Sequence, residues 1–295
     1  MSTRPNQKLG YILASVAAIS FGMAVAISRY AYDSGANGIT VASFRAIVMA
    51  VGLWLFCMLS GRNMRLPRGL YPHVIGLGLL LALMYYGNIG SVEYIPIGLA
   101  ALVFFTFPPV IAVIEAVLDR RLPPLMKLIA VGLGFAGIAM MLGVSLGDAH
   151  PIGIALALVA SAATAVNAVW MGRRMVGLDM VKITAYLALV AAVALPVACI
   201  LRGGPQFPMD QIGWAGMIGV AILQSSGIPI YYASIPLIGA LKSAMVTNIQ
   251  PVVSIIAAYF MFGELLTNWQ IFGGCLVLLS VWLTNYGAPQ RAPEE

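Results

Sequence analysis

The side chains of this 295-residue sequence that could recognise a small molecule lie inside long apolar segments rather than in polar loops. Carboxamide groups occur at Gln224 and Asn248, and Lys242 adds an ammonium group nearby. Polar groups at the depth of a bilayer core are costly, so they are typical either of a binding site or of hydrogen bonds that join helices. The sequence leaves both alternatives open. The candidates for substrate binding are Tyr85, Tyr86, Asn88, Asn167, Trp170, Gln224, Tyr231, Lys242 and Asn248.

The chemistry of these candidates favours an amphipathic substrate. Gln224 and Tyr231 are seven residues apart and therefore lie on one helix face. Aromatic rings can stack on an apolar or aromatic substrate, while the amides hold its polar ends. Trp170 also fits the aromatic belt at a membrane surface, and Lys242 could equally extend to that surface. Arg45, near the end of an apolar segment, is interpreted as structural or interfacial.

Proline interrupts the apolar pattern at matching places. The sequences IPIGLAALVFFTFPP and IPLIGALKSAMVTNIQP stand roughly 140 residues apart. A proline inside a helix leaves the carbonyl one turn earlier without its amide partner, and in a membrane that carbonyl must face protein or a wet cavity. We therefore expect helix breaks that open a shared cavity near the membrane midplane, at Pro108, Pro109, Pro229 and Pro251.

The composition is that of an all-α integral membrane protein. Hydrophobic residues make up 61% of the chain and charged residues 9%, whereas soluble proteins carry about 25% charged residues. The formal net charge is +6, but the basic residues are scattered singly between apolar segments, so no nucleic-acid partner is expected. The lipid bilayer is the expected environment.

Ten transmembrane helices are predicted, each near the roughly 20 apolar residues that cross a bilayer. The first apolar run is too long for a cleavable signal peptide. Most Lys and Arg residues fall on one side of the predicted topology, which places both termini in the cytoplasm. The predicted spans are residues 10–31, 40–60, 70–92, 97–118, 125–146, 151–171, 181–202, 211–234, 239–262 and 269–287.

The repeated proline pattern divides the chain into two five-helix units, residues 1–147 and 148–288, followed by a cytoplasmic tail at 289–295. Five is an odd number, so the second unit must enter the membrane inverted relative to the first. Inverted repeats are typical of secondary transporters, which bind substrate where the repeats meet.

The segments from Tyr94 to Pro108 and from Pro251 to Gln270 resemble the two halves of the drug/metabolite transporter superfamily, EamA type. The resemblance covers essentially the whole chain and extends to bacterial exporters of aromatic and some other amino acids. It implies a multi-pass carrier of the bacterial inner membrane with a central cavity and alternating access. No cofactor or metal is implied, and we expect a monomer whose partner is a small-molecule substrate.

Two other functions stay open as alternatives. The sequence GVSLG, residues 143–147, matches the G-x-S-x-G pattern of serine hydrolases, with His150 nearby, although no third catalytic group is apparent. The second alternative is a passive metabolite channel. The sequence GLGFAG, residues 132–137, matches a dinucleotide-binding pattern but lies in an apolar run, where close helix packing is the better interpretation.

Overall fold

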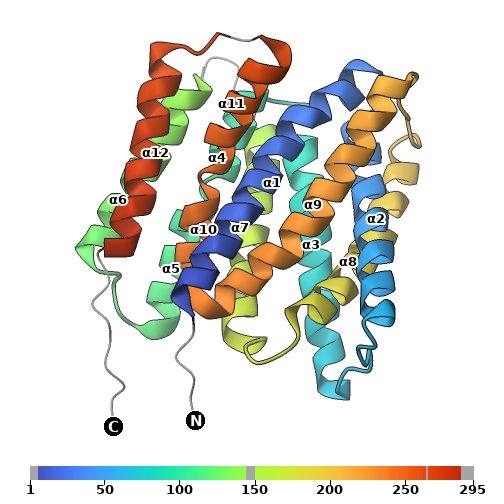
Figure 1. Cartoon of the computed structure of the whole chain (residues 1–295), viewed down its shortest axis with the longest axis horizontal. Helices are drawn as coiled ribbons and strands as arrows, with labels where there is room; N and C mark the ends of the chain where they lie inside the picture. The colour runs from blue at the N-terminus through green and yellow to red at the C-terminus, as the bar shows by residue number, and fades with distance from the viewer. Residues whose placement is uncertain (1–5, 144–149, 264, 287–295) are drawn as a thin grey trace.

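The computed structural model describes residues 6–143, 150–263 and 265–286, which form helices joined by short loops (Figure 1). No strand occurs in these ranges. The helices are α1 (Gln7–Asp33), α2 (Gly38–Leu59), a short 3-10 helix (Arg68–Leu70), α3 (Tyr71–Ser91), α4 (Ile97–Phe104), α5 (Phe107–Asp119), α6 (Leu125–Leu142), α7 (Pro151–Arg174), α8 (Met180–Leu201), α9 (Gln211–Ile238), α10 (Ala240–Thr247), α11 (Gln250–Phe262) and α12 (Asn268–Tyr286).

The described helices make this a multi-pass membrane protein. Nine segments within the described ranges are long and apolar enough to cross a bilayer, counting α4 with α5 and α10 with α11 as one segment each. A further apolar stretch, Asn268–Thr284 of α12, is shorter. The count of ten spans, with an inverted second half, stays a prediction.

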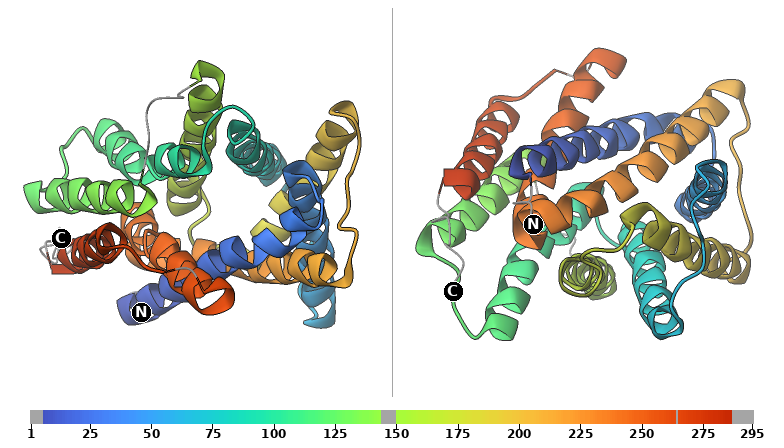
Figure 2. Two further views of the ribbon diagram at one scale, coloured as in Figure 1. Left: turned by 90° about the horizontal axis from the view of Figure 1, so that it is seen from above. Right: turned by 60° about the horizontal axis from the view of Figure 1, so that its bottom comes forward.

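The helices form one bundle in which the start of α1 and the end of α12 lie at the same end (Figure 1). We call this the terminus end. In that view α6 and α12 form one flank of the bundle, and α2 and α8 form the opposite flank. The two further views keep α1 and α9 side by side, in agreement with their extensive contact (Figure 2).

Contacts between the helices recur in matched pairs. The packing of α1 against α9 has its counterpart in α7 against α3, and the packing of α1 against α11 has its counterpart in α7 against α5. The helices α2 and α8 pack on each other, as do α6 and α12. Two similarly folded halves packed face to face produce this pattern.

Glycines bring α6 and α12 together. A methyl group added at Gly137 would lie 2.6 Å from the Gly273 carbonyl oxygen, and one added at Gly273 would lie 2.5 Å from the Gly137 carbonyl oxygen. Such close backbone approach is possible only between residues without a side chain. The GLGFAG segment therefore lies within a helix and includes a packing contact, as the apolar context predicted.

Two membrane segments are broken in the same way. A helix of 8 residues, α4 or α10, is followed by a helix of 13 residues, α5 or α11, with two non-helical residues between them. Pro108 and Pro251 are the second residues of α5 and α11, where a helix needs no backbone N–H donor. The breaks expected at Pro108, Pro109 and Pro251 are present.

The break expected at Pro229 is absent, because α9 continues through both Pro229 and Pro236. A proline in a membrane helix can be accommodated where neighbouring helices hold the segment in place. Here α9 lies along α1, and Gly227 approaches Phe21 so closely that a methyl group would lie 2.7 Å from the ring. This packing keeps α9 in one piece.

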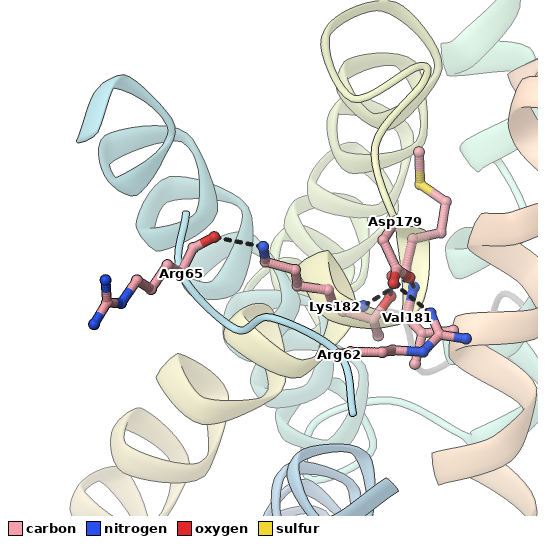
Figure 3. Close-up of polar contacts among 7 residues, drawn as sticks. Arg62, Arg65, Asp179, Val181 and Lys182 are labelled. Atoms are coloured by element: carbon pink, nitrogen blue, oxygen red, sulfur yellow. Dashed lines mark hydrogen bonds and ion pairs between the residues drawn. The ribbon is translucent and has the colours of Figure 1, made fainter. Parts of the chain in front are cut away.

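At the terminus end, polar side chains join the loop after α2 to the start of α8 (Figure 3). The Asp179 carboxylate pairs with Arg62 and accepts hydrogen bonds from the backbone N–H groups of Val181 and Lys182, at 3.1 and 3.3 Å. Lys182 also donates to the Arg65 carbonyl oxygen. Asp179 is thus the N-cap of α8 as well as a partner of the loop.

Candidate functional site

A cavity of about 100 Å³ lies in the middle of the bundle, where the two broken segments meet. Phe104 and Phe107 border it from the first break, and Thr247 and Gln250 border it from the second. The cavity is smaller than pockets for drug-sized ligands, which suits a small metabolite. It is lined by Phe21, Arg45, Leu81, Met84, Tyr85, Asn88, Phe104, Phe107, Thr164, Gln224, Ile228, Tyr231, Tyr232, Thr247 and Gln250.

The lining is amphipathic. The Phe104 and Phe107 rings lie 5.5 Å apart, centre to centre, and offer an aromatic surface. Carboxamides of Asn88, Gln224 and Gln250 and hydroxyls of threonines provide hydrogen-bonding groups. A molecule with an apolar body and a polar end matches this mixture.

Arg45 is the only charged residue among the described residues of that lining, and three contacts fix its position. Its Nη1 donates a hydrogen bond to Gln224 Oε1 at 2.8 Å, which links α2 to α9. Its guanidinium carbon stands 3.7 Å from the centre of the Tyr85 ring, a close cation–π contact. Its backbone carbonyl accepts a longer hydrogen bond, 3.4 Å, from the Ser225 hydroxyl.

The charge of Arg45 has no counter-charge within the described residues. None of the ion pairs found there involves Arg45, and its Nε atom is buried without a hydrogen-bond partner. Among the described residues, no Asp or Glu side chain lines the cavity. A membrane-embedded cation is costly unless it is paired, so this arrangement is suited to an anion.

Four of the nine residues predicted to bind substrate line the cavity, namely Tyr85, Asn88, Gln224 and Tyr231. Tyr231 packs edge-on against Phe21, with ring centres 6.5 Å apart. Its hydroxyl group is buried and has no hydrogen-bond partner among the described residues. Arg45 Nε and the Tyr231 hydroxyl are therefore two unpartnered polar groups on the residues of one cavity.

Two of the predicted amides lie in helix contacts instead. Asn167 Nδ2 donates to the Leu77 carbonyl oxygen at 3.0 Å and so joins α7 to α3. Asn248 lies between α10 and α11, with its Nδ2 atom 3.9 Å from Met245 Sδ and close against Gly134 of α6. The two-residue break turns Asn248 toward α6, whereas Thr247 and Gln250 on either side line the cavity.

The other three predicted residues lie outside the cavity lining. The Tyr86 ring lies below the guanidinium of Arg202, at 5.3 Å. Trp170 is 39% exposed and packs against His73, as expected for a residue near the end of a membrane segment. Lys242 is half-buried with its Nζ atom 6.0 Å from the Tyr11 ring.

Sequence reasoning missed Arg45 as a site residue, did not consider Phe21 or Thr164, and preferred Asn248 to Gln250 in the second broken segment. One signal for Arg45 was present, because a charged residue inside an apolar segment is functional by default. The other three are ordinary for membrane helices, and only the packing of separate segments brings them together.

The residues of the serine hydrolase alternative do not form a described site. Ser145 lies outside the described residues. The His150 imidazole caps α7, where its Nδ1 atom accepts a hydrogen bond from the backbone N–H of Ile152 at 3.3 Å, and its ring packs against Tyr94. Within the described ranges, no group of three or more His, Cys, Asp or Glu side chains could hold a metal ion.

Comparison with known proteins gives consistent results. The model of the EamA-like transporter family matches the chain twice, at residues 8–143 and 151–286. The uncharacterized transporter sll1319 of Synechocystis is 27% identical over 215 residues, which are 70% of this chain and 63% of that protein. The uncharacterized transporter YvbV of Bacillus subtilis is 26% identical over 224 residues, 73% of this chain and 72% of that protein.

The fold also has a counterpart among solved structures. One crystal structure superposes on this chain with a TM-score of 0.78, and the superposition covers 94% of this chain and 96% of the other. The two sequences are 16% identical, so this likeness concerns the fold alone.

Proposed function

Given that this chain belongs to the EamA-like transporter family and moves a small molecule across a membrane, we propose that it exports amino acids, with aromatic and hydrophobic ones favoured. The proposal includes alternating access by a secondary transporter in a bacterial inner membrane. Ten spans in two inverted five-helix repeats, both termini in the cytoplasm and a monomeric state complete it.

The observation that carries the proposal is the cavity at the meeting point of the two broken segments. Backbone interrupted at membrane depth is tolerated only where it faces protein or a cavity, and transporters build their binding sites from such discontinuous helices. The aromatic rings of Phe104 and Phe107 suit an apolar side chain, and the amides and Arg45 suit the polar end of an amino acid.

The reciprocal packing of the halves supports alternating access over a passive channel. The paired contacts of α1 with α9 and α7 with α3 give two units of similar construction. Two such units can tilt against each other around a fixed site, whereas a channel needs a continuous pore.

Transport in proteoliposomes tests the proposal. We expect uptake of labelled phenylalanine, and stimulation of that uptake by unlabelled phenylalanine on the opposite side, because a carrier returns faster when loaded. Uptake without such stimulation would indicate a channel. Liposomes that take up neither aromatic nor aliphatic amino acids, with or without a pH gradient, would overturn amino-acid export while leaving the family assignment intact.

A further inference from the structure

We propose that the cavity recognises its substrate by a carboxylate group bound to Arg45, and that an amino group on the substrate is dispensable. The expected class is therefore small carboxylic acids with an apolar body, of which amino acids are one case. This inference rests on the transport function proposed above and adds the chemical group on which selectivity depends.

Arg45 has unsatisfied hydrogen-bonding capacity. A guanidinium has five N–H donors, and the described residues accept a side-chain hydrogen bond from one atom only, Nη1. Nε is buried without a partner. The N–H groups of Nε and Nη2 point in the same direction, the geometry that binds both oxygens of a carboxylate.

The Arg45 guanidinium is held in position by its neighbours. Tyr85, itself 3% exposed, supports one face of the group, and Gln224 holds Nη1 from α9. The partners are a neutral ring and a neutral amide, so they orient the cation without neutralising it. A carboxylate entering the cavity would supply the missing negative charge.

The lining of the cavity disfavours amines. The described residues of the lining include no Asp or Glu, so an ammonium group would find neutral oxygen atoms of Asn88, Thr164 or Gln250 there but no carboxylate. Near Arg45 an ammonium group would also meet a like charge. A carboxylic acid without an amino group loses nothing essential, while an amine without a carboxylate loses its only ionic contact.

A structural role for Arg45 is the competing explanation. The Arg45–Gln224 hydrogen bond joins residues 179 positions apart in the sequence and could serve only to fasten α2 to α9. In that case the charge of Arg45 would affect stability but not the ranking of ligands. Selectivity and stability must therefore be measured on the same variants.

The test uses three ligands with the same phenylethyl body, namely phenylalanine, 3-phenylpropionate and phenethylamine, and a matching set with a 3-methylbutyl body. Inhibition of transport by each ligand is measured with the full-length protein in liposomes, and ligand-induced shifts in melting temperature are measured in detergent. The variants are Arg45→Gln, Arg45→Lys and, as a control for net charge, Arg121→Gln, which changes an exposed cation outside the cavity.

For the wild type we expect the carboxylates with and without the amino group to bind within a fewfold of each other, and the amines to bind far more weakly. A hydrogen-bonded charge pair corresponds to roughly a 10- to 150-fold change in affinity, so Arg45→Gln should lose about that factor for both carboxylates. It should also abolish the preference over the amine. Arg45→Lys should keep the preference with weaker binding, and Arg121→Gln should behave as the wild type.

Other outcomes separate this inference from the proposed function. Binding of 3-phenylpropionate without phenylalanine would overturn amino-acid export and support the inference. Binding of phenylalanine and phenethylamine alike, with a ranking unchanged in Arg45→Gln, would overturn the inference and keep the function. Binding of none of the carboxylates would overturn both. If Arg45→Gln fails to fold, the wild-type ranking still tests the preference for carboxylates, and the affinity of Arg45→Lys for them tests whether Arg45 provides it.

Discussion

The two broken membrane segments have the same backbone plan but bring different chemistry to the cavity. Both consist of helices of 8 and 13 residues with a proline in the first turn of the second helix. The first places the rings of Phe104 and Phe107 at the cavity, and the second places Thr247 and Gln250 there. The break provides the opening, and the residues beside it determine what is recognised.

The difference extends to the ends of these segments. The residue after α5 is Arg120, with φ of 51°, and the residue after α11 is Gly263, with φ of 67°. Both are left-handed C-caps, but only the second half has the residue type that adopts this conformation without strain. The two halves thus share a backbone plan but differ in the conformational strain at the end of their broken segments.

The largest expected effect concerns one of the contacts that join the two halves, between α6 and α12. Gly137→Ala would place a methyl group 2.6 Å from a backbone oxygen of Gly273, which cannot move aside as a flexible side chain would. Overpacking of this kind costs about 1–3 kcal/mol or more. We expect a clearly lower melting temperature and less folded protein in detergent, and the reciprocal change Gly273→Ala should act similarly.

Gly132→Ala is the matched control in the same helix, because a methyl group there meets nothing within 4 Å. Alanine favours helix over glycine by about 0.5–1 kcal/mol, so this variant should be unchanged or slightly more stable. Equal melting temperatures for Gly132→Ala and Gly137→Ala would show that α6 and α12 do not pack through these glycines.

The next effect sharpens the contrast between the two breaks. Gln250→Leu should weaken transport of every amino acid, since it removes a carboxamide that lines the cavity and makes no hydrogen bond to the described residues. We expect the free energy of substrate binding to weaken by about 1–3 kcal/mol, a loss of roughly 5- to 150-fold in apparent affinity, with little change in stability.

Phe107→Leu should instead lower the preference for aromatic over aliphatic amino acids, by about 0.5–1.5 kcal/mol.

Asn248→Ala, at the same break but outside the cavity, controls this measurement. Its side chain contacts Met245 and Gly134, so the variant should lose stability and keep its apparent affinity. A loss of affinity with unchanged melting temperature would place Asn248 in the binding site after all. Transport assays in liposomes give the apparent affinity, and thermal unfolding in one detergent gives the stability.

Much of the fold follows from the sequence, because the length of an apolar segment and the position of a proline are local properties. The segments predicted at 97–118 and 239–262 correspond to Ile97–Asp119 and Ala240–Phe262, each interrupted where Pro108 and Pro251 indicate. Pro229 behaved differently, since the packing of α9 along α1 outweighed the local preference of proline.

The residues of the cavity were harder to predict, because whether a residue lines the cavity depends on the direction of its side chain after the segments pack. Gln224 and Tyr231 share a helix face and both line the cavity, as their spacing suggested. Arg45 was interpreted as structural or interfacial from its position in the segment. Its partner Gln224 is 179 residues away, and no pattern within the sequence predicts that pairing.

The smallest expected effect tests the two C-caps by exchanging their chemistry. A residue with a side chain in the left-handed region costs about 1–2 kcal/mol, whereas glycine costs about 0.5–1 kcal/mol in extra freedom of the unfolded chain. Arg120→Gly should therefore raise the free energy of unfolding by up to roughly 1 kcal/mol, and Gly263→Ala should lower it by a similar amount. Steric contact does not complicate the second change, since a methyl group at Gly263 meets nothing within 4 Å.

Arg121→Gly is the control, because it removes the same charge without relieving strain: Arg120 is the only described non-glycine residue with positive φ. Thermal unfolding of the three variants should show one increase and two changes that are neutral or negative. Arg120→Gly and Arg121→Gly with the same melting temperature would mean that the left-handed conformation of Arg120 carries no cost, and the two halves would then end their broken segments equally well.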